Sequence, residues 1–407
     1  MSIGPILSSL KRNKIQAVLI ILEIALSCAI VSNATFMISQ RLERMERATG
    51  LADDQVVRIN VAGIGESENP GAQVRQDLAE LRSIAGVKAA TSLNHVPFDN
   101  SAWNGSVRLD RNQRGPSLNV AMYLGKDLLD TLGLTLVEGR DFSPSEYVDW
   151  EQFNSGGPAL RVPSAIITRD VAERLFPGQS AIGKEIYAWN PDNSPHRIVG
   201  VVERLIRPND NGGIENAGFS LLLPMKDLTM GRFALRTDPS QREAVEKAAI
   251  AALERSSNRR VIMEHAAFTD VMRQYYQKDR DMAWLLAILM MGLLAITALG
   301  LFGIASFWVS QRTRSIGIRR ALGATRRQIL RYFQLENFLL VSIGIALGMI
   351  GAYGINQVLM SHYELDRLPA LYLPVGAALL LLIGQLAVWS PARRASSVAP
   401  AVATGGF

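Results

Sequence analysis

The chain has 407 residues, a formal net charge of +6 and an isoelectric point near 9.5. Its apolar fraction of 48% is ordinary, but the apolar residues are gathered in long blocks. Much of the positive excess lies in short segments beside these blocks, and this placement does not indicate a nucleic-acid-binding surface. The single cysteine, Cys28, excludes an intrachain disulfide and a multi-cysteine metal site.

The first apolar block spans residues 15–38 and follows the basic cluster at residues 11–14. It is too long for a signal-peptide core and lacks a clear cleavage pattern, so it predicts a retained transmembrane helix with residues 1–14 in the cytoplasm. Glu23 lies within it and is costly at membrane depth unless it is paired or faces protein. We favour a packing role for Glu23 over a proton or substrate site.

Residues 39–281 contain no block that could span a membrane, and their pattern is that of a large α+β domain with two subdomains. Four apolar or alternating runs predict strands: 55–61, 118–124, 198–202 and 219–223. Three segments predict helices: residues 72–85, a helix that runs to Phe176 with Thr168 as its N-cap, and a helix that runs from Pro239 to Leu253 with Asp238 as its N-cap. Segments 147–160 and 208–213 are expected to be loops.

Catalytic patterns are hard to find in this domain. The four histidines show no metal-ligand spacing, and Asp279 with Asp281 is expected to be a solvated helix face, not a catalytic dyad. Residues 178–184 have the spacing of a phosphate-binding loop, but Glu185 stands where a magnesium-binding hydroxyl belongs. This segment also follows a helix instead of linking a strand to a helix. We therefore expect neither a cofactor, a metal site nor enzymatic activity in this chain.

Three further spans follow, at residues 282–309, 335–360 and 371–389. The second has 28 uncharged residues, roughly 42 Å of helix, whereas the hydrocarbon core is about 30 Å thick. The helical pattern that begins at Phe268 suggests a rigid helical stalk, which enters the large domain and is continuous with this span. Four spans place both termini in the cytoplasm, with residues 361–370 outside and 390–407 inside. Small residues in the third span predict close helix packing, namely Gly344, Gly348, Gly351 and Gly354.

The segment between the second and third spans, residues 310–334, is strongly basic and has no acidic residue from Gln311 to Arg331. Its charge places it in the cytoplasm. Gly323 and Ala324 mark a break, after which Thr325 and Gln328 have capping-box spacing. Charge alone fits a purely topogenic loop, but apolar residues alternate with the arginines, which such a loop does not need. We therefore favour a partner-binding helix, whose apolar residues insert into a groove of the partner. The residues concerned are Arg312, Arg314, Ile316, Ile318, Arg319, Arg320, Leu322, Gly323, Ala324, Thr325 and Arg326.

The order of one span, a large outer domain and three spans resembles the MacB/FtsX-type permeases of ABC transporters (type VII). The resemblance is carried by residues 298–304 and 311–325, by the Leu-Phe-Pro-Gly run at 175–178, and by residues 182–184 and 197–202. Residues 23–27 and 391–395 are similar to the family's first and last spans. Ser315 departs from the glutamate common in the family, and the C-terminal tail lacks the usual charged residues.

The resemblance implies an α-helical inner-membrane protein with four transmembrane helices and a MacB-like periplasmic core domain. It implies a separate ATPase subunit that binds the ATP, a second permease subunit, identical or paralogous, and possible periplasmic adaptor and outer-membrane channel partners. The basic segment would couple to the ATPase, and the motion would pass to the outer domain without substrate crossing between the spans. Export is the expected outcome. Regulation of a cell-wall hydrolase and lipoprotein release are the alternatives.

Overall fold

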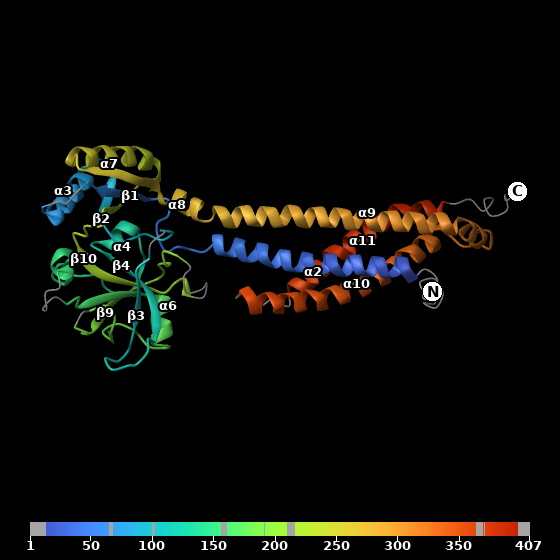
Figure 1. Cartoon of the computed structure of the whole chain (residues 1–407), viewed down its shortest axis with the longest axis horizontal. Helices are drawn as coiled ribbons and strands as arrows, with labels where there is room; N and C mark the ends of the chain where they lie inside the picture. The colour runs from blue at the N-terminus through green and yellow to red at the C-terminus, as the bar shows by residue number, and fades with distance from the viewer. Residues whose placement is uncertain are drawn as a thin grey trace. The chain divides into compact units, whose positions relative to one another are not determined.

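The computed structural model describes residues 14–64, 68–99, 102–155, 161–190, 192–209, 216–363, 369 and 371–397. The chain forms two compact units (Figure 1). One comprises the N-terminal residues up to Glu46 and those from Lys278 onward, and the other comprises Arg47–Gln277. The predicted loops at 208–213 and 361–370 lie largely outside the described residues.

The membrane unit contains four helices long and apolar enough to cross a bilayer. They are α2 (Lys14–Met45), α9 (Gln277–Ala321), α10 (Arg326–Tyr363) and α11 (Tyr372–Ser396). The first three contain the predicted spans in full and extend beyond them at both ends, and α11 begins one residue after the predicted start of the fourth span and extends beyond its end. α9 is one uninterrupted helix of 45 residues, roughly 67 Å long.

The predicted continuity from Phe268 into the second span is wrong. The helix α8 (Phe268–Tyr275) ends before Tyr276, and α9 begins at Gln277. Phe98, Tyr275 and Tyr276 form a cluster of aromatic rings with centroid separations of 4.9–5.1 Å. The packing of these rings fixes the end of α8 within its own unit.

The membrane unit has an apolar core shared by all four helices. Ile24, Leu301, Leu340 and Leu380 come from α2, α9, α10 and α11 in turn, and all are almost fully buried in one cluster. Other apolar side chains point outward, including Ile15 at 78% exposure and Ile350 at 72%. In a span these outward faces meet lipid or another subunit.

The first subdomain of the other unit is a four-stranded antiparallel sheet with strand order β12-β1-β11-β2. Its strands are β1 (Val56–Gly63), β2 (Val87–Ser92), β11 (Arg232–Thr237) and β12 (Arg260–Ala267). Helices α3 (Pro70–Ser83) and α7 (Arg242–Ser256) pack on the sheet. Their apolar side chains and those of the strands form one separate core.

The second subdomain is built on a larger mixed sheet with the path β3-β4-β10-β7-β9-β5. Its path strands are β3 (Asn104–Val107), β4 (Leu118–Gly125), β5 (Leu136–Gly139), β7 (Ser164–Thr168), β9 (His196–Val202) and β10 (Ser220–Lys226). Two short strands, β6 (Val148–Asp149) and β8 (Glu185–Ile186), pair at its sides, and α4 (Leu128–Leu132), α5 (Trp150–Asn154) and α6 (Arg169–Leu175) complete it. Its core is distinct from that of the first subdomain, which confirms the predicted pair of subdomains.

Two local predictions for this subdomain need correction. Segment 147–160, expected to be a loop, includes β6 and α5, which bury Trp150 and Phe153. Thr168 stands at the predicted N-cap of α6, but its hydroxyl donates to the carbonyl oxygen of Gly218 at 2.6 Å and does not cap the helix. In both cases tertiary packing decided the local structure.

Candidate functional site

The basic segment is held at the end of α9 and the start of α10. α9 continues through Arg312–Arg320, so the residues expected in a separate short helix are the last turns of the second span. The chain breaks at Gly323, whose φ of +98° suits glycine. Gln328 Oε1 accepts from the Thr325 backbone N–H at 2.8 Å, and Thr325 Oγ1 accepts from the Gln328 N–H at 3.3 Å. The predicted capping box is thereby confirmed.

One flank of the helix end is buried within the chain. Ile316 is only 4% exposed and belongs to a cluster with Phe333 on α10 and Ala392 on α11. Within this chain Ile316 is therefore packed against neighbouring helices, and its insertion into a partner stays a prediction. Its role is to fix the end of α9 against the neighbouring helices, since burial of such a side chain contributes about 1.5–3 kcal/mol.

Some of the arginines are also engaged within the chain. Arg312 Nη1 lies 2.9 Å from Glu336 Oε2, and the Glu336 side chain is almost fully buried. The Arg319 guanidinium lies 5.2 Å from the centroid of the Tyr332 ring. Arg320 is half-buried. The sequence predicts that all these arginines bind a partner. Arg312 instead forms an ion pair with Glu336 of this chain.

The opposite flank is exposed. Ile318 is 47% exposed and Leu322 is 83% exposed. Arg314, Ile318 and Leu322 are spaced by four residues, so they lie along one side of the helix end. Arg319, which follows Ile318, and Arg326, the first residue of α10, are also exposed. We call these five residues the docking face: it combines exposed apolar side chains with cations, which suits a partner groove that is apolar with an acidic rim.

The four glycines of the third span behave differently from one another. A Cβ at Gly344 would lie 2.7 Å from the Ile24 Cβ, and one at Gly348 would lie 2.5 Å from the Cys28 Cβ. Both therefore allow α10 to approach α2 closely, as predicted. A Cβ at Gly351 or Gly354 would meet nothing within 4 Å. Among the described residues these two positions have no close neighbour, so their predicted packing stays a prediction.

Two acidic side chains of the membrane unit, those of Glu23 and Asp279, contact neighbouring helices. A Cβ at Gly300 on α9 would lie 2.6 Å from Glu23 Oε1, so the Glu23 carboxylate rests against the second span. This agrees with the packing role that we favoured for Glu23. Asp279 is buried and lies 2.5 Å from Arg41 Nη1 and 3.1 Å from Arg44 Nη1. Asp279 is therefore not on a solvated face, and it ties the start of α9 to the end of α2.

The phosphate-loop look-alike is a structural turn. Residues 178–184 connect α6 to β8, not a strand to a helix. Lys184 Nζ donates to Gln179 Oε1 at 2.7 Å and lies 4.4 Å from the centre of the Phe176 ring. Within the described part of the chain, no group of three or more His, Cys, Asp and Glu side chains has metal-site geometry.

Four helices long and apolar enough to cross a bilayer, with a two-subdomain unit inserted between the first and second, are the architecture of a multi-pass membrane protein. Two family models match the chain. The MacB-like periplasmic core domain matches residues 17–252, and the FtsX-like permease C-terminal domain matches residues 287–400. The chain belongs to the family of MacB/FtsX-type ABC transporter permeases.

Curated relatives agree with this assignment. A macrolide export ATP-binding/permease protein MacB of Chromobacterium violaceum is 24% identical over 68% of this chain and 42% of the relative. One from a Shewanella species is 27% identical over 77% of this chain and 48% of the relative. The chain thus spans under half of these relatives. An uncharacterized ABC transporter permease of Bacillus subtilis, YvrN, is 23% identical over 96% of both chains.

The extracellular domain of the transporter YknZ is a similar solved structure. It is 16% identical, with a TM-score of 0.32, and covers 51% of this chain and all of that chain.

Proposed function

We propose that this chain couples ATP hydrolysis by a separate ATPase subunit to movement of its two-subdomain unit outside the cytoplasm, and thereby drives export. The observation that carries the proposal is the structure of α9. A single helix runs from Gln277 to Ala321 and ends in the docking face. A rigid helix with an exposed partner surface at one end transmits displacement to its other end.

The contacts around α9 support this role. At one end, Ile316 and Arg312 fix the helix to α10 and α11. At the other end, Asp279 is held by two arginines of α2. Load applied at the docking face would therefore move α9 together with its neighbours, while the exposed Ile318 and Leu322 remain free to contact the ATPase.

The proposed orientation follows from the positive-inside rule. Seven arginines lie between residues 312 and 331, and Arg393 with Arg394 follows the last apolar span. Basic loops of this kind stay in the cytoplasm. Residues 47–277 then lie outside, and both termini lie inside the inner membrane.

The proposal includes a second permease subunit. The membrane unit leaves large apolar side chains exposed on each of its four helices. Gly351 and Gly354 add a face of α10 on which a Cβ would meet no described residue of this chain within 4 Å. A second copy or a paralogue would supply such a neighbour.

Affinity purification of the tagged chain from its native membrane, followed by mass spectrometry, tests the proposal. Recovery of an ABC ATPase in constant ratio, with nucleotide hydrolysis lost when its catalytic glutamate is removed, is the expected result. Recovery of the chain without any ATPase, under conditions that retain the membrane, would contradict it.

A further inference from the structure

Residues 93–99 lie where the two subdomains meet, and we call them the junction segment. They follow β2 of the first subdomain and lead towards β3 of the second. Strands of both sheets bind this segment, and so does α8. It is therefore placed to pass a displacement of one of these parts to the others.

The junction segment binds β4 of the second subdomain much as a neighbouring strand would. Asn94 Nδ2 donates to the Met122 carbonyl oxygen at 2.8 Å, and Asn94 Oδ1 accepts from the Leu124 N–H at 2.9 Å. The Asn94 backbone N–H donates to the Leu124 carbonyl oxygen at 3.3 Å. The His95 ring lies edge-on to the Tyr123 ring, with the centroids 4.6 Å apart. Asn94 is fully buried and His95 is 1% exposed, so these contacts are shielded from solvent.

The same segment is bound to two strands of the first subdomain. The Leu93 N–H donates to the Arg232 carbonyl oxygen at 3.1 Å, and Arg232 Nη1 donates to the Asn94 carbonyl oxygen. At the other end, Asp99 Oδ1 lies 3.5 Å from Arg58 Nη1, and Asp99 Oδ2 lies 3.7 Å from Arg232 Nη1. Both ends of the segment are thus tied to β1 or β11.

The turn near the end of the segment holds Phe98 in a strained backbone conformation. The Asp99 N–H donates to the Val96 carbonyl oxygen at 3.3 Å, so these residues close a turn with Pro97 at its second position. Phe98, at the third position, has a φ of +65°. A turn of this kind favours glycine there, and a bulky side chain at this φ is unusual. The surrounding structure must therefore hold the turn.

Aromatic rings of α8 provide contacts that hold it. The Phe98 ring stacks on the Phe268 ring, with the centroids 5.7 Å apart, and lies 4.9 and 5.1 Å from the rings of Tyr275 and Tyr276. Phe98 is only 6% exposed. The chain continues from Tyr276 directly into Gln277, the first residue of α9. A displacement of α8 would therefore act first on the Phe98 ring.

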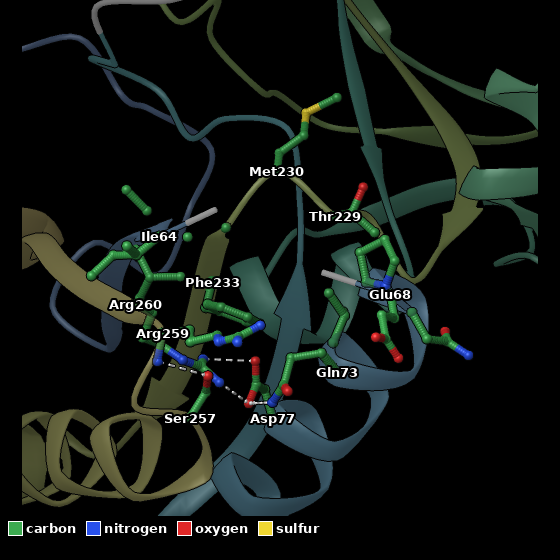
Figure 2. A pocket seen from close by; sticks show the side chains of 17 residues that line it. Ile64, Glu68, Gln73, Asp77, Thr229, Met230, Phe233, Ser257, Arg259 and Arg260 are labelled. Atoms are coloured by element: carbon green, nitrogen blue, oxygen red, sulfur yellow. Dashed lines mark hydrogen bonds and ion pairs between the residues drawn. The ribbon is translucent and has the colours of Figure 1, made fainter. Parts of the chain in front are cut away.

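The strand before α8 belongs to a braced subdomain. β12 ends at Ala267, immediately before α8, and is paired with β1 up to that residue. Figure 2 shows Arg260 of β12 joined to Asp77 of α3, and Arg260 donates to both carboxylate oxygens at 2.8 Å. Both side chains are at most 5% exposed. Because the ladder and this ion pair fix β12, we expect a displacement of α8 to be taken up by the junction segment.

We propose that the position of α8 sets how firmly the junction segment binds β4, and that Phe98 is the residue through which α8 acts. With α8 in place, its rings hold the turn at a positive φ, and Asn94 binds β4. When α8 is displaced, the turn relaxes to a negative φ, which moves the segment and loosens Asn94 from β4. The two subdomains then separate more easily. The inference rests on the proposed function only for the force that displaces α8.

The test measures amide hydrogen exchange of the full chain in lipid nanodiscs, resolved to single residues by mass spectrometry. The readout is the Leu124 N–H, which Asn94 Oδ1 accepts. Tyr276→Ala removes one ring from Phe98 without altering the segment. It should raise the exchange rate of the Leu124 N–H about two- to ten-fold, which corresponds to the loss of one aromatic contact.

Two substitutions of Phe98 separate backbone strain from packing. Phe98→Ala removes the ring but keeps a Cβ at the positive φ, so the turn relaxes and the exchange rate should rise about two- to ten-fold. Phe98→Gly also removes the ring, yet glycine adopts this φ without strain, so the rate should stay within about two-fold of the wild type. If Phe98 served packing alone, glycine would raise the rate at least as much as alanine, because glycine also makes the unfolded chain more flexible.

Thermal unfolding of each variant shows whether it is folded. Tyr276→Ala is also measured in the Phe98→Gly background, where it should no longer affect the Leu124 N–H. Equal exchange rates in Phe98→Ala and Phe98→Gly would overturn the inference, as would a wild-type rate in Tyr276→Ala. If Phe98→Ala does not fold, the two Tyr276→Ala measurements decide, and an equal rise in both backgrounds would overturn it. The measurements use no ATPase, so failure here is distinguishable from failure of the proposed ATPase coupling.

Discussion

Leu322→Asp tests the docking face most sharply. Leu322 is 83% exposed, so the substitution should change the stability of the free chain by no more than about 0.5 kcal/mol. In a complex where Leu322 is buried, loss of the apolar side chain alone costs about 1.5–3 kcal/mol. That corresponds to about 10- to 150-fold weaker ATPase binding. Desolvation of the new carboxylate adds to the loss.

The assay is titration of the ATPase that co-purifies with the wild-type chain onto nanodiscs containing each variant. Leu322→Met, which conserves volume and polarity, should bind like the wild type. Arg331→Ala changes the net charge by the same single unit and leaves the apolar centre intact, so it should lose at most about 1 kcal/mol. Binding by Leu322→Asp within two-fold of the wild type would refute the reasoning and leave the basic segment with a topogenic role only.

Ile316→Asp should behave differently from Leu322→Asp, because it places a carboxylate in a cluster where Ile316 is 4% exposed. Thermal melting of the nanodisc-embedded chain should show a large destabilisation. An unchanged melting midpoint would contradict the packing described. Asp77→Ala should destabilise the two-subdomain unit by about 3–5 kcal/mol, because it leaves Arg260 buried without its partner, and denaturant unfolding followed by tryptophan fluorescence measures this. Burial lowers the pKa of His95 to about 3 and that of His196 to about 4, so each is protonated more readily in the unfolded state. The contribution of these two histidines to stability should therefore be constant well above pH 6.5 and fall at lower pH by about 1.4 kcal/mol per pH unit per histidine, down to about pH 4 for His196 and about pH 3 for His95, and His95→Phe should reduce that slope. An unchanged slope in His95→Phe would show that this histidine is not the source of the acid sensitivity.

Much of the fold follows from the sequence because its signals are local and strong. The four apolar blocks are long enough to identify each span, and the strand at 118–124 and the helix at 72–85 show clear periodicity. The α5 helix was missed because residues 147–160 lack a clear period, and its two aromatic residues are buried by contacts distant in the sequence. The end of α8 at Tyr275 was missed because no proline or glycine marks it in the sequence.

The candidate site was only half predictable. Charge and capping residues identified the segment, and the break at Gly323 was found correctly. Which flank is exposed depends on α10 and α11, and no local pattern distinguishes Ile316 from Ile318. Likewise, Gly344 faces α2 and Gly351 has no close neighbour among the described residues, although their local sequence patterns are alike. Intramolecular packing between distant helices decides such questions.

The central claim is that α9 transmits nucleotide-driven motion as one rigid helix. The direct test places an environment-sensitive dye at Lys278→Cys, the exposed start of the helix, in the complex with its ATPase. The native Cys28 is buried and should not react. The dye signal should change on ATP binding in the wild type and in Ser310→Ala. In Ser310→Pro, which kinks the helix, the ATPase should still bind while the dye response is lost. The same ATP-dependent response in Ser310→Pro as in Ser310→Ala would contradict the account.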